Sequence, residues 1–127
     1  MQPKLTPSLD EISTAYIRAG SVYINAKIAK GFFSKFRGLL FKPALDDREA
    51  LVITPCRSVH TCGMHYAIDL IFLNKQFKVI NIEHQCQPWR FFYCKGAVHT
   101  IEMMGGQAEM LNLSIGQTFI FYPTSLE

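Results

Sequence analysis

The spacing of apolar and polar residues along this chain predicts β-strands over most of its length. Val22, Ile24, Ala26 and Ile28 alternate with polar residues, as expected for a strand that buries one face. The stretch 67–73 is almost wholly apolar, which is typical of a strand buried on both faces. The same criteria predict strands at 22–28, 50–54, 67–73, 78–85, 91–93, 97–103 and 118–122.

Two stretches have helical spacing instead. Near the N-terminus, Ser8 and Glu11 have the form of a capping box, and apolar residues then repeat every three or four positions up to Gly20. The apolar residues of 31–40 repeat in the same way. We therefore predict two helices, with residues 1–20 as an N-terminal helix extension and 21–127 as a single β-rich domain.

The predicted fold class is α+β. A chain of 127 residues is the size of one compact domain and can bury roughly two thirds of its unfolded surface, so it needs no disulfides to form a core. Most of the predicted strands follow one another through short turns, which favours antiparallel pairing. We expect mostly antiparallel strands that form a small, partly closed barrel, with two or three short helices.

The net charge of +3 is too small to imply a nucleic-acid partner, but the charge is unevenly distributed. One basic stretch contains no acidic residue. Its cations are Lys27, Lys30, Lys35, Arg37 and Lys42. The simplest explanation is the solvated face of the helix at 31–40, and a surface that docks on a larger assembly is the alternative.

The N-terminal residues contain no apolar segment of the signal-peptide type, and no later segment is long enough to span a membrane. We therefore expect a cytoplasmic protein. Because the cytosol keeps thiols reduced, all four cysteines are expected to be free. They are Cys56, Cys62, Cys86 and Cys94.

A cluster of residues with reactive or metal-binding side chains lies within 54–66. It includes Cys56, His60, Cys62 and His65, whose spacing matches none of the usual zinc motifs. In an extended chain His60 and Cys62 share a face, as do His84 and Cys86, so a soft metal between two strands is one alternative. A nucleophilic Cys62 beside His60 is another. Buried cysteine used as a small hydrophobic residue is commoner than either, and we predict no metal and no cofactor.

Asp69 lies in the middle of a strand that is otherwise apolar. A buried carboxylate is costly unless it is paired or hydrogen-bonded. Arg37, Arg57 and His60 are the candidate partners, and arginine suits bidentate contact with a carboxylate. Alternatively, Asp69 accepts backbone N–H bonds and holds a turn.

Several short blocks occur in a fixed order between about Ala26 and Tyr122. They are Arg37-Gly38-Leu39-Leu40, Thr54-Pro55-Cys56-Arg57-Ser58-Val59-His60-Thr61, Gly63-Met64, Ile68-Asp69, Phe72-Leu73, Pro88-Trp89-Arg90, Ile101-Glu102 with Gly106, and Ile115-Gly116. In these blocks the chain resembles the domain-of-unknown-function 192 family of small prokaryotic domains. Cys62 departs from the family pattern, which usually has an aromatic residue there, and this argues against a zinc site common to the family.

The resemblance implies a compact β-rich domain and no particular substrate. It also implies that a set of signature residues gathers near one face. These are Arg37, Arg57, His60, Thr61, Asp69 and Glu102.

The function we expect is binding of a small molecule or an extended peptide in a polar depression. The expected ligand contacts are Arg37, Arg57, His60, Thr61, Asp69, Trp89 and Glu102. Arginine would hold a carboxylate or phosphate, and Trp89 would form either an apolar wall of the site or a cap over the core. One alternative is a hydrolase in which Asp69 or Glu102 orients His60 as general base. Another is an adapter that docks through the basic helix.

The segment 57–64 would form one edge of this depression. We expect it to be an irregular strand edge, with Gly63 allowing a bend. Val59 and Met64 would anchor it in the core, while Arg57, His60 and Thr61 would be exposed. The sequence predicts no nucleic-acid partner and leaves the oligomeric state open.

Overall fold

The computed structural model describes residues 12–30 and 45–126. The helix predicted at 31–40, and Arg37 within it, lie outside these residues. Nine strands and one short helix are described. They are β1 (Ile12–Ala19), β2 (Val22–Lys30), β3 (Glu49–Thr54), β4 (Ser58–His60), β5 (Ile68–Leu73), β6 (Val79–Cys86), β7 (Phe91–Tyr93), β8 (His99–Met104), α2 (Gln107–Met110) and β9 (Ile120–Leu126).

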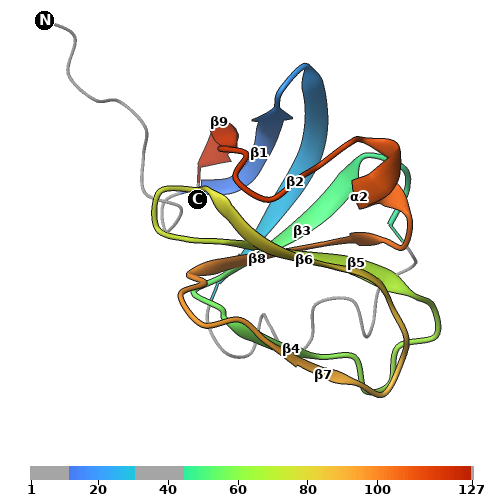
Figure 1. Cartoon of the computed structure of the whole chain (residues 1–127). Coiled ribbons are helices and arrows are strands. Elements are labelled where there is room, and N and C mark those ends of the chain that lie inside the picture. The colour runs from blue at the N-terminus through green and yellow to red at the C-terminus, as the bar shows by residue number, and fades with distance from the viewer. Residues whose placement is uncertain (1–11, 31–44, 127) are drawn as a thin grey trace, which may run out of the picture.

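Seven of these strands form one twisted sheet in the order β6-β5-β8-β3-β2-β1-β9 (Figure 1). Every neighbouring pair is antiparallel except β2 and β3, which run parallel. The remaining two strands, β4 and β7, pair with each other as a separate ribbon, which Figure 1 shows below the sheet. The fold is therefore a large open sheet with a small two-stranded cover.

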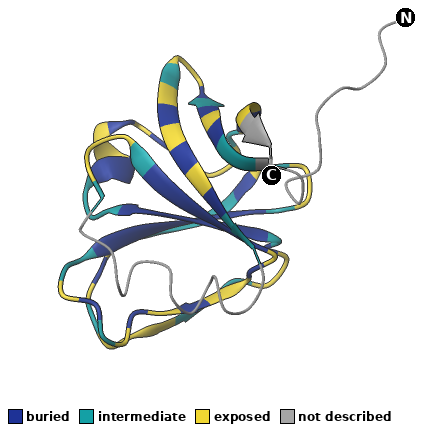
Figure 2. Cartoon of the chain, turned by 180° about the vertical axis from the view of Figure 1, so that it is seen from behind, coloured by how far each residue is buried: buried dark blue, intermediate teal, exposed yellow. Residues whose placement is uncertain are grey.

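The sheet separates two hydrophobic cores. The first core includes Val52 of β3 and Ile71 of β5, and it lies on the face that also carries the helix α2. The second core includes the neighbouring residues Leu51 and Leu70, which alternation places on the opposite face, together with Val59 of the ribbon. Burial on both faces explains why β3 and β5 are apolar almost throughout, as the dark strands of Figure 2 show.

At the other end of the sheet only one face is buried. Ile24, Ala26 and Ile28 of β2 are buried in the first core, while Tyr23, Asn25 and Lys27 are exposed. Figure 2 shows this as alternating bands along the strand. The predicted period of two is therefore confirmed for 22–28.

The prediction of an α+β fold with a partly closed barrel was wrong, because the described residues are mostly β, with one four-residue helix and an open sheet. The two ends of the sheet approach each other through an isolated bridge between Lys78 and Thr118 and through backbone hydrogen bonds that join residues 77–79 to 116–119. Beyond this point β9 pairs with β1 and leaves β6 as a free edge of the sheet. The barrel does not close because these bonds make a short contact and not a full ladder between β6 and β9.

The prediction of an N-terminal helix within residues 1–20 was also wrong for the part of this segment that the structure describes. Residues Ile12–Ala19 form β1, which pairs with β2 and β9. The apolar residues of this segment fit both periods, and Ala15, Ile17 and Ala19 satisfy the period of two. Pairing with two neighbouring strands selects the extended form, since tertiary contacts override a weak local preference. No helix in the described part of the chain is long and apolar enough to cross a membrane.

Candidate functional site

The outer side of the β4–β7 ribbon exposes an unusual concentration of aromatic side chains. Phe91 and Tyr93 alternate with Phe92, which packs inward on the second core, so both point away from it. Phe91 is 69% exposed, Tyr93 55% and Trp89, just before the strand, 67%. His60 is exposed directly opposite Phe91 on β4. Large aromatic side chains usually bury most of their surface, so three exposed together indicate a contact surface.

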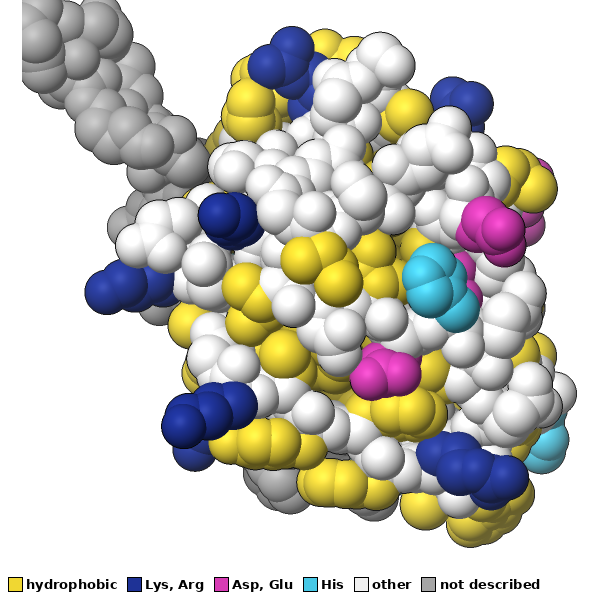
Figure 3. All heavy atoms as spheres, in the orientation of Figure 1, with side chains coloured by type: hydrophobic (Ala, Val, Ile, Leu, Met, Phe, Trp, Pro, Cys, Tyr) yellow, Lys and Arg dark blue, Asp and Glu magenta, His cyan; other side chains and the backbone are white. Residues whose placement is uncertain are grey.

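Basic residues flank these aromatic side chains. Arg57 and Arg90 are exposed at the two ends where β4 and β7 begin. Figure 3 shows hydrophobic and basic side chains next to each other along the lower rim of the molecule, where Figure 1 places the ribbon. We call this set the aromatic–basic surface. It consists of Arg57, His60, Trp89, Arg90, Phe91 and Tyr93.

Thr61 positions the loop that presents Trp89. Its hydroxyl donates to the carbonyl oxygen of Gln87 at 2.8 Å and accepts the N–H of Arg90 at 2.8 Å. Its backbone N–H donates to the Arg90 carbonyl at 2.8 Å, and its carbonyl accepts the Trp89 N–H at 3.0 Å. Thr61 is fully buried, contrary to the prediction that it is exposed. Thr61 therefore joins the segment 57–64 to the loop 87–90 through these four hydrogen bonds.

Trp89 adopts a backbone conformation that non-glycine residues rarely use. Its φ is +65°, in the left-handed region. The hydrogen bonds between Thr61 and this loop, together with those from the Arg90 guanidinium to the carbonyls of Pro88 and Trp89, hold the loop in place. The alternative that Trp89 caps the core is wrong, because two thirds of the side chain is exposed. A strained residue held so that its indole faces solvent is a reason to look for function there.

Asp69 is fully buried and bonded only to backbone donors in the described structure. Its carboxylate accepts the N–H of Gln85 at 2.8 Å on one oxygen, and those of Gly106 at 3.0 Å and Ala108 at 2.8 Å on the other. Gly106 has φ +97°, a conformation that favours glycine and that aims its N–H at the carboxylate. Asp69 therefore fastens the turn before α2 to the end of β6. This is the structural alternative that the sequence left open.

Glu102 is also buried, but on the other face of the sheet. It lies opposite Leu51 and Leu70, which belong to the second core, and only 6% of it is exposed. Burial raises the pKa of the Glu102 carboxyl to about 8. Among the residues that the structure describes, the buried Tyr66 hydroxyl has no hydrogen-bond partner. Burial and the charge of Glu102 raise the pKa of Tyr66. The second core thus contains a carboxyl group that holds its proton at neutral pH.

The predicted site residues therefore fall into three places. Arg57, His60 and Trp89 lie on the ribbon, with Thr61 buried beneath them. Asp69 lies opposite Met103 of the first core, whereas Glu102 lies on the face of the second core. The expectation that Asp69 and Glu102 share one polar depression with the ribbon residues is wrong, because the sheet separates the two carboxyl groups.

Comparison with known proteins identifies the chain. A sequence profile of DUF192, the domain-of-unknown-function 192 family described as "Uncharacterized ACR", matches residues 15–121. The chain belongs to the DUF192 family. The resemblance seen in the sequence blocks is thereby confirmed.

Two DUF192-type relatives are UPF0127 proteins. One, from Thermococcus sibiricus, is 39% identical over 97 residues, and the match covers 71% of this chain and 61% of the relative. The other, from Pyrococcus furiosus, is 32% identical over 102 residues, covering 75% of this chain and 84% of the relative. The match thus spans less than two thirds of the Thermococcus protein. A crystal structure of a protein of unknown function from Novosphingobium aromaticivorans has the same fold, with a TM-score of 0.74, 20% identity and coverage of 86% of this chain and 84% of that one.

Sequence reasoning missed three members of the aromatic–basic surface in this DUF192 domain. Phe91 and Tyr93 were assigned only to a strand, and Arg90 only to a sequence block. The alternation of Phe91, Phe92 and Tyr93 indicates that one face differs from the other, but not which face is exposed. A buried hydrogen bond of 2.7 Å between the Thr54 hydroxyl and His99 Nδ1 also had no sequence signal.

The histidines and cysteines of this DUF192 domain do not converge. Among residues 12–30 and 45–126, no three side chains of His, Cys, Asp or Glu are grouped so that they could hold a metal ion. Cys56 and Cys86 are buried, Cys94 is half-buried and Cys62 is exposed, and none is in a disulfide. The cysteines therefore differ mainly in accessibility.

We expect one fast-reacting thiol in the native protein, that of Cys62. The reactive form is the thiolate. Burial, followed by the charges of Glu83 and Asp69, raises the pKa of Cys86 to about 12, and burial and Glu83 raise the pKa of Cys94. With DTNB at pH 8, Cys62 should react at least about tenfold faster than the other thiols. Cys62→Ser should remove the fast phase, and denaturant should release four equivalent thiols. A second fast thiol, or fewer than four in denaturant, would contradict this.

Proposed function

We propose that this protein is a binding domain whose aromatic–basic surface holds an extended acidic segment of a partner protein. The observation that carries the proposal is the exposure of Trp89, Phe91 and Tyr93 together on one two-stranded ribbon. Tryptophan, tyrosine and arginine are the residues that most often dominate the energy of protein interfaces. Backbone pairing of β4 with β7 also orders the strands before a partner binds, which lowers the entropy cost of binding compared with a free loop.

The charge of the ribbon supports an acidic ligand. Residues 55–66 and 87–98 contain no Asp or Glu, whereas Arg57, Arg90 and Lys95 are exposed there. Arginine binds carboxylates in a planar, bidentate manner. Three exposed cations suit a peptide with two or three carboxylates better than a nucleic acid, because tight nucleic-acid binding typically uses about six to ten phosphate contacts.

The geometry gives less support to the hydrolase alternative. In that alternative Asp69 or Glu102 orients His60, so one of these carboxyl groups has to lie within hydrogen-bond reach of the imidazole. His60 is exposed on the outer side of the ribbon, while Asp69 and Glu102 are buried within the two cores. The adapter surface at 31–42 lies outside the described residues, and a cytoplasmic location stays a prediction.

The proposal predicts enrichment of acidic peptides. A phage-displayed library of random twelve-residue peptides, selected on the full-length protein, should return sequences rich in Asp and Glu. The strongest synthetic peptide should bind at least about tenfold more tightly than its Asn/Gln-substituted copy, which corresponds to about 1.4 kcal/mol. Because Trp89 is the only tryptophan in the chain, binding should also change the intrinsic fluorescence.

Matched variants decide whether the surface is the one proposed. With a labelled peptide and fluorescence anisotropy, Trp89→Ala should weaken binding at least about tenfold, as hot-spot aromatic residues do. Tyr23→Ala, which removes a comparably exposed aromatic residue from β2, should leave it unchanged. Peptides without acidic enrichment, an unaffected Trp89→Ala variant, or tighter binding to an oligonucleotide such as (dT)12 would each overturn the proposal.

A further inference from the structure

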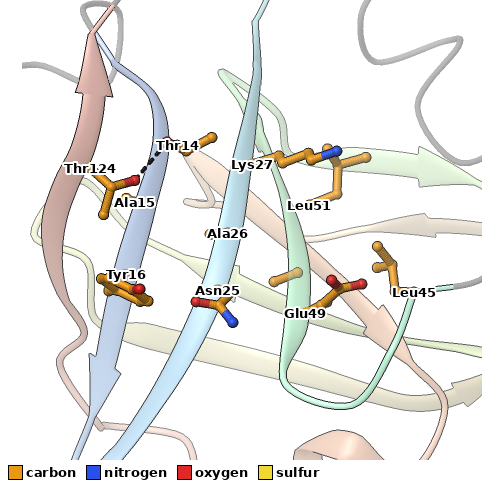
Figure 4. A pocket seen from close by; sticks show the side chains of 11 residues that line it. Thr14, Ala15, Tyr16, Asn25, Ala26, Lys27, Leu45, Glu49, Leu51 and Thr124 are labelled. Atoms are coloured by element: carbon orange, nitrogen blue, oxygen red, sulfur yellow. Dashed lines mark hydrogen bonds between the residues drawn. The ribbon is translucent and has the colours of Figure 1, made fainter.

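A cavity of about 250 Å³ lies against β1, β2 and β3, and none of its lining residues belongs to the aromatic–basic surface. Its polar lining includes Tyr16, Asn25, Lys27 and Glu49 (Figure 4). These side chains lie on the face of the sheet opposite the first core, because they alternate with the buried residues Ala15 and Ala26. Its volume is just below the roughly 300 Å³ at which small-molecule sites usually begin, so the ligand it fits is small.

The strand register places one cation and one anion side by side in this cavity. Asn25 pairs with Glu49 and Lys27 pairs with Leu51 in the parallel ladder of β2 and β3. Glu49 precedes Leu51 by two residues, so the Lys27 and Glu49 positions are offset by about 7 Å along the strands on the same face. Figure 4 shows the Lys27 side chain extending toward Leu51, and the Glu49 carboxylate extending toward Leu45 instead of toward Lys27.

Neither charge is neutralised by the other. Within residues 12–30 and 45–126 the structure records no ion pair between Lys27 and Glu49. One Glu49 oxygen accepts the backbone N–H of Asp46 at 2.9 Å, which holds the carboxylate in position. The cavity therefore presents an ammonium group at one end and a fixed carboxylate at the other. The apolar side chains of Leu45 and Leu51 lie beside them.

We propose that this cavity binds a small zwitterion with a short apolar body, such as a free aliphatic amino acid. The carboxylate of the ligand pairs with Lys27, and the ammonium group of the ligand pairs with Glu49 and the side-chain amide oxygen of Asn25. The apolar body rests on Leu45 and Leu51. A cation and an anion at fixed spacing select a molecule that carries both opposite charges over one that carries either alone.

Calorimetric titration of the full-length protein with leucine tests this, using two analogues that each lack one charge. Leucine should bind at least about tenfold more tightly than 4-methylpentanoate, which lacks the amine, and than 3-methylbutylamine, which lacks the carboxylate. Valine should bind in the same way. If neither amino acid binds at millimolar concentration, or if an analogue binds as well as leucine, the proposal is overturned.

Charge-removing variants assign each end of the cavity. Lys27→Met should abolish the preference for leucine over 3-methylbutylamine, and Glu49→Gln should abolish the preference for leucine over 4-methylpentanoate. Lys75→Met, at an exposed lysine in the turn between β5 and β6, should change neither. Thermal unfolding within a few degrees of the parent protein checks that each variant is folded. Leucine binding that survives both Lys27→Met and Glu49→Gln would place the ligand elsewhere and refute the site.

Discussion

Asp69→Asn is expected to lower the free energy of unfolding by about 3 kcal/mol. The Asp69 carboxylate accepts three backbone N–H bonds of 2.8, 3.0 and 2.8 Å in a fully buried position. Hydrogen bonds to a charged group contribute about 1.5–3 kcal/mol each, and a buried donor left without an acceptor costs a further 1–3 kcal/mol. An asparagine amide offers one oxygen and one NH2 group, so at least one backbone donor then faces another donor.

Urea unfolding of the parent and the variant at pH 7 measures this loss. Hydrogen exchange should also show reduced protection at the amides of Gln85, Gly106 and Ala108, because those are the donors concerned. Asp46→Asn, at an exposed residue, is the matched control and should change stability by less than about 0.5 kcal/mol. A loss below about 1 kcal/mol for Asp69→Asn would show that the three bonds do not hold the turn before α2.

Glu102→Gln is expected to remove most of a stability loss that the parent protein undergoes between about pH 4.5 and pH 8. Burial raises the pKa of Glu102 from 4.5 to about 8. Between these values the folded protein keeps a proton that the unfolded chain has released, so stability falls as pH rises and levels off above pH 8. The steepest slope is about 1.4 kcal/mol per pH unit, and the full interval amounts to on the order of 5 kcal/mol.

The difference between the two proteins isolates this carboxyl group from the other ionisable groups, which both proteins share. Urea unfolding at pH 5, 6, 7 and 8 should show that the free energy of unfolding of Glu102→Gln rises relative to that of the parent protein as pH rises. Glutamine keeps the shape of the glutamate side chain and cannot ionise. Glu109→Gln, at an exposed residue of α2, should differ from the parent protein in free energy of unfolding by an amount that does not vary with pH. If Glu102→Gln behaves like Glu109→Gln, the carboxyl group of Glu102 is ionised at little cost and its burial is less complete than the structure indicates.

The strands could be predicted closely wherever the period of two was unambiguous. The predicted strands at 22–28 and 50–54 correspond to β2 and β3, and the buried run at 67–73 corresponds to β5. Val59 and Met64 are buried and Arg57 and His60 are exposed, as predicted for the segment 57–64. These features depend on the preferences of neighbouring residues, which a sequence displays directly.

The N-terminal segment shows where this reasoning fails. Its apolar residues at 12, 15, 16 and 19 fit a helix, and those at 15, 17 and 19 fit a strand equally well. Contacts with β2 and β9 decide between the helix and the strand, and β9 is distant from this segment along the chain. A local pattern that fits two periods contains no information about those contacts.

The sequence by itself determined the strands, the buried runs and the concentration of polar and aromatic residues at 54–66 and 86–93. Only the tertiary structure decided which of these residues share a surface. Asp69 and Glu102 lie on adjacent strands but on opposite faces, because Asp69 is opposite Met103 and Glu102 is opposite Leu70. Shifting the register by one residue would reverse a strand's faces, and register depends on the neighbouring strand and not on the strand's own composition. The sheet therefore separates two carboxyl groups that the sequence analysis had placed in one site, and pairing with β4 turns Phe91 and Tyr93 outward.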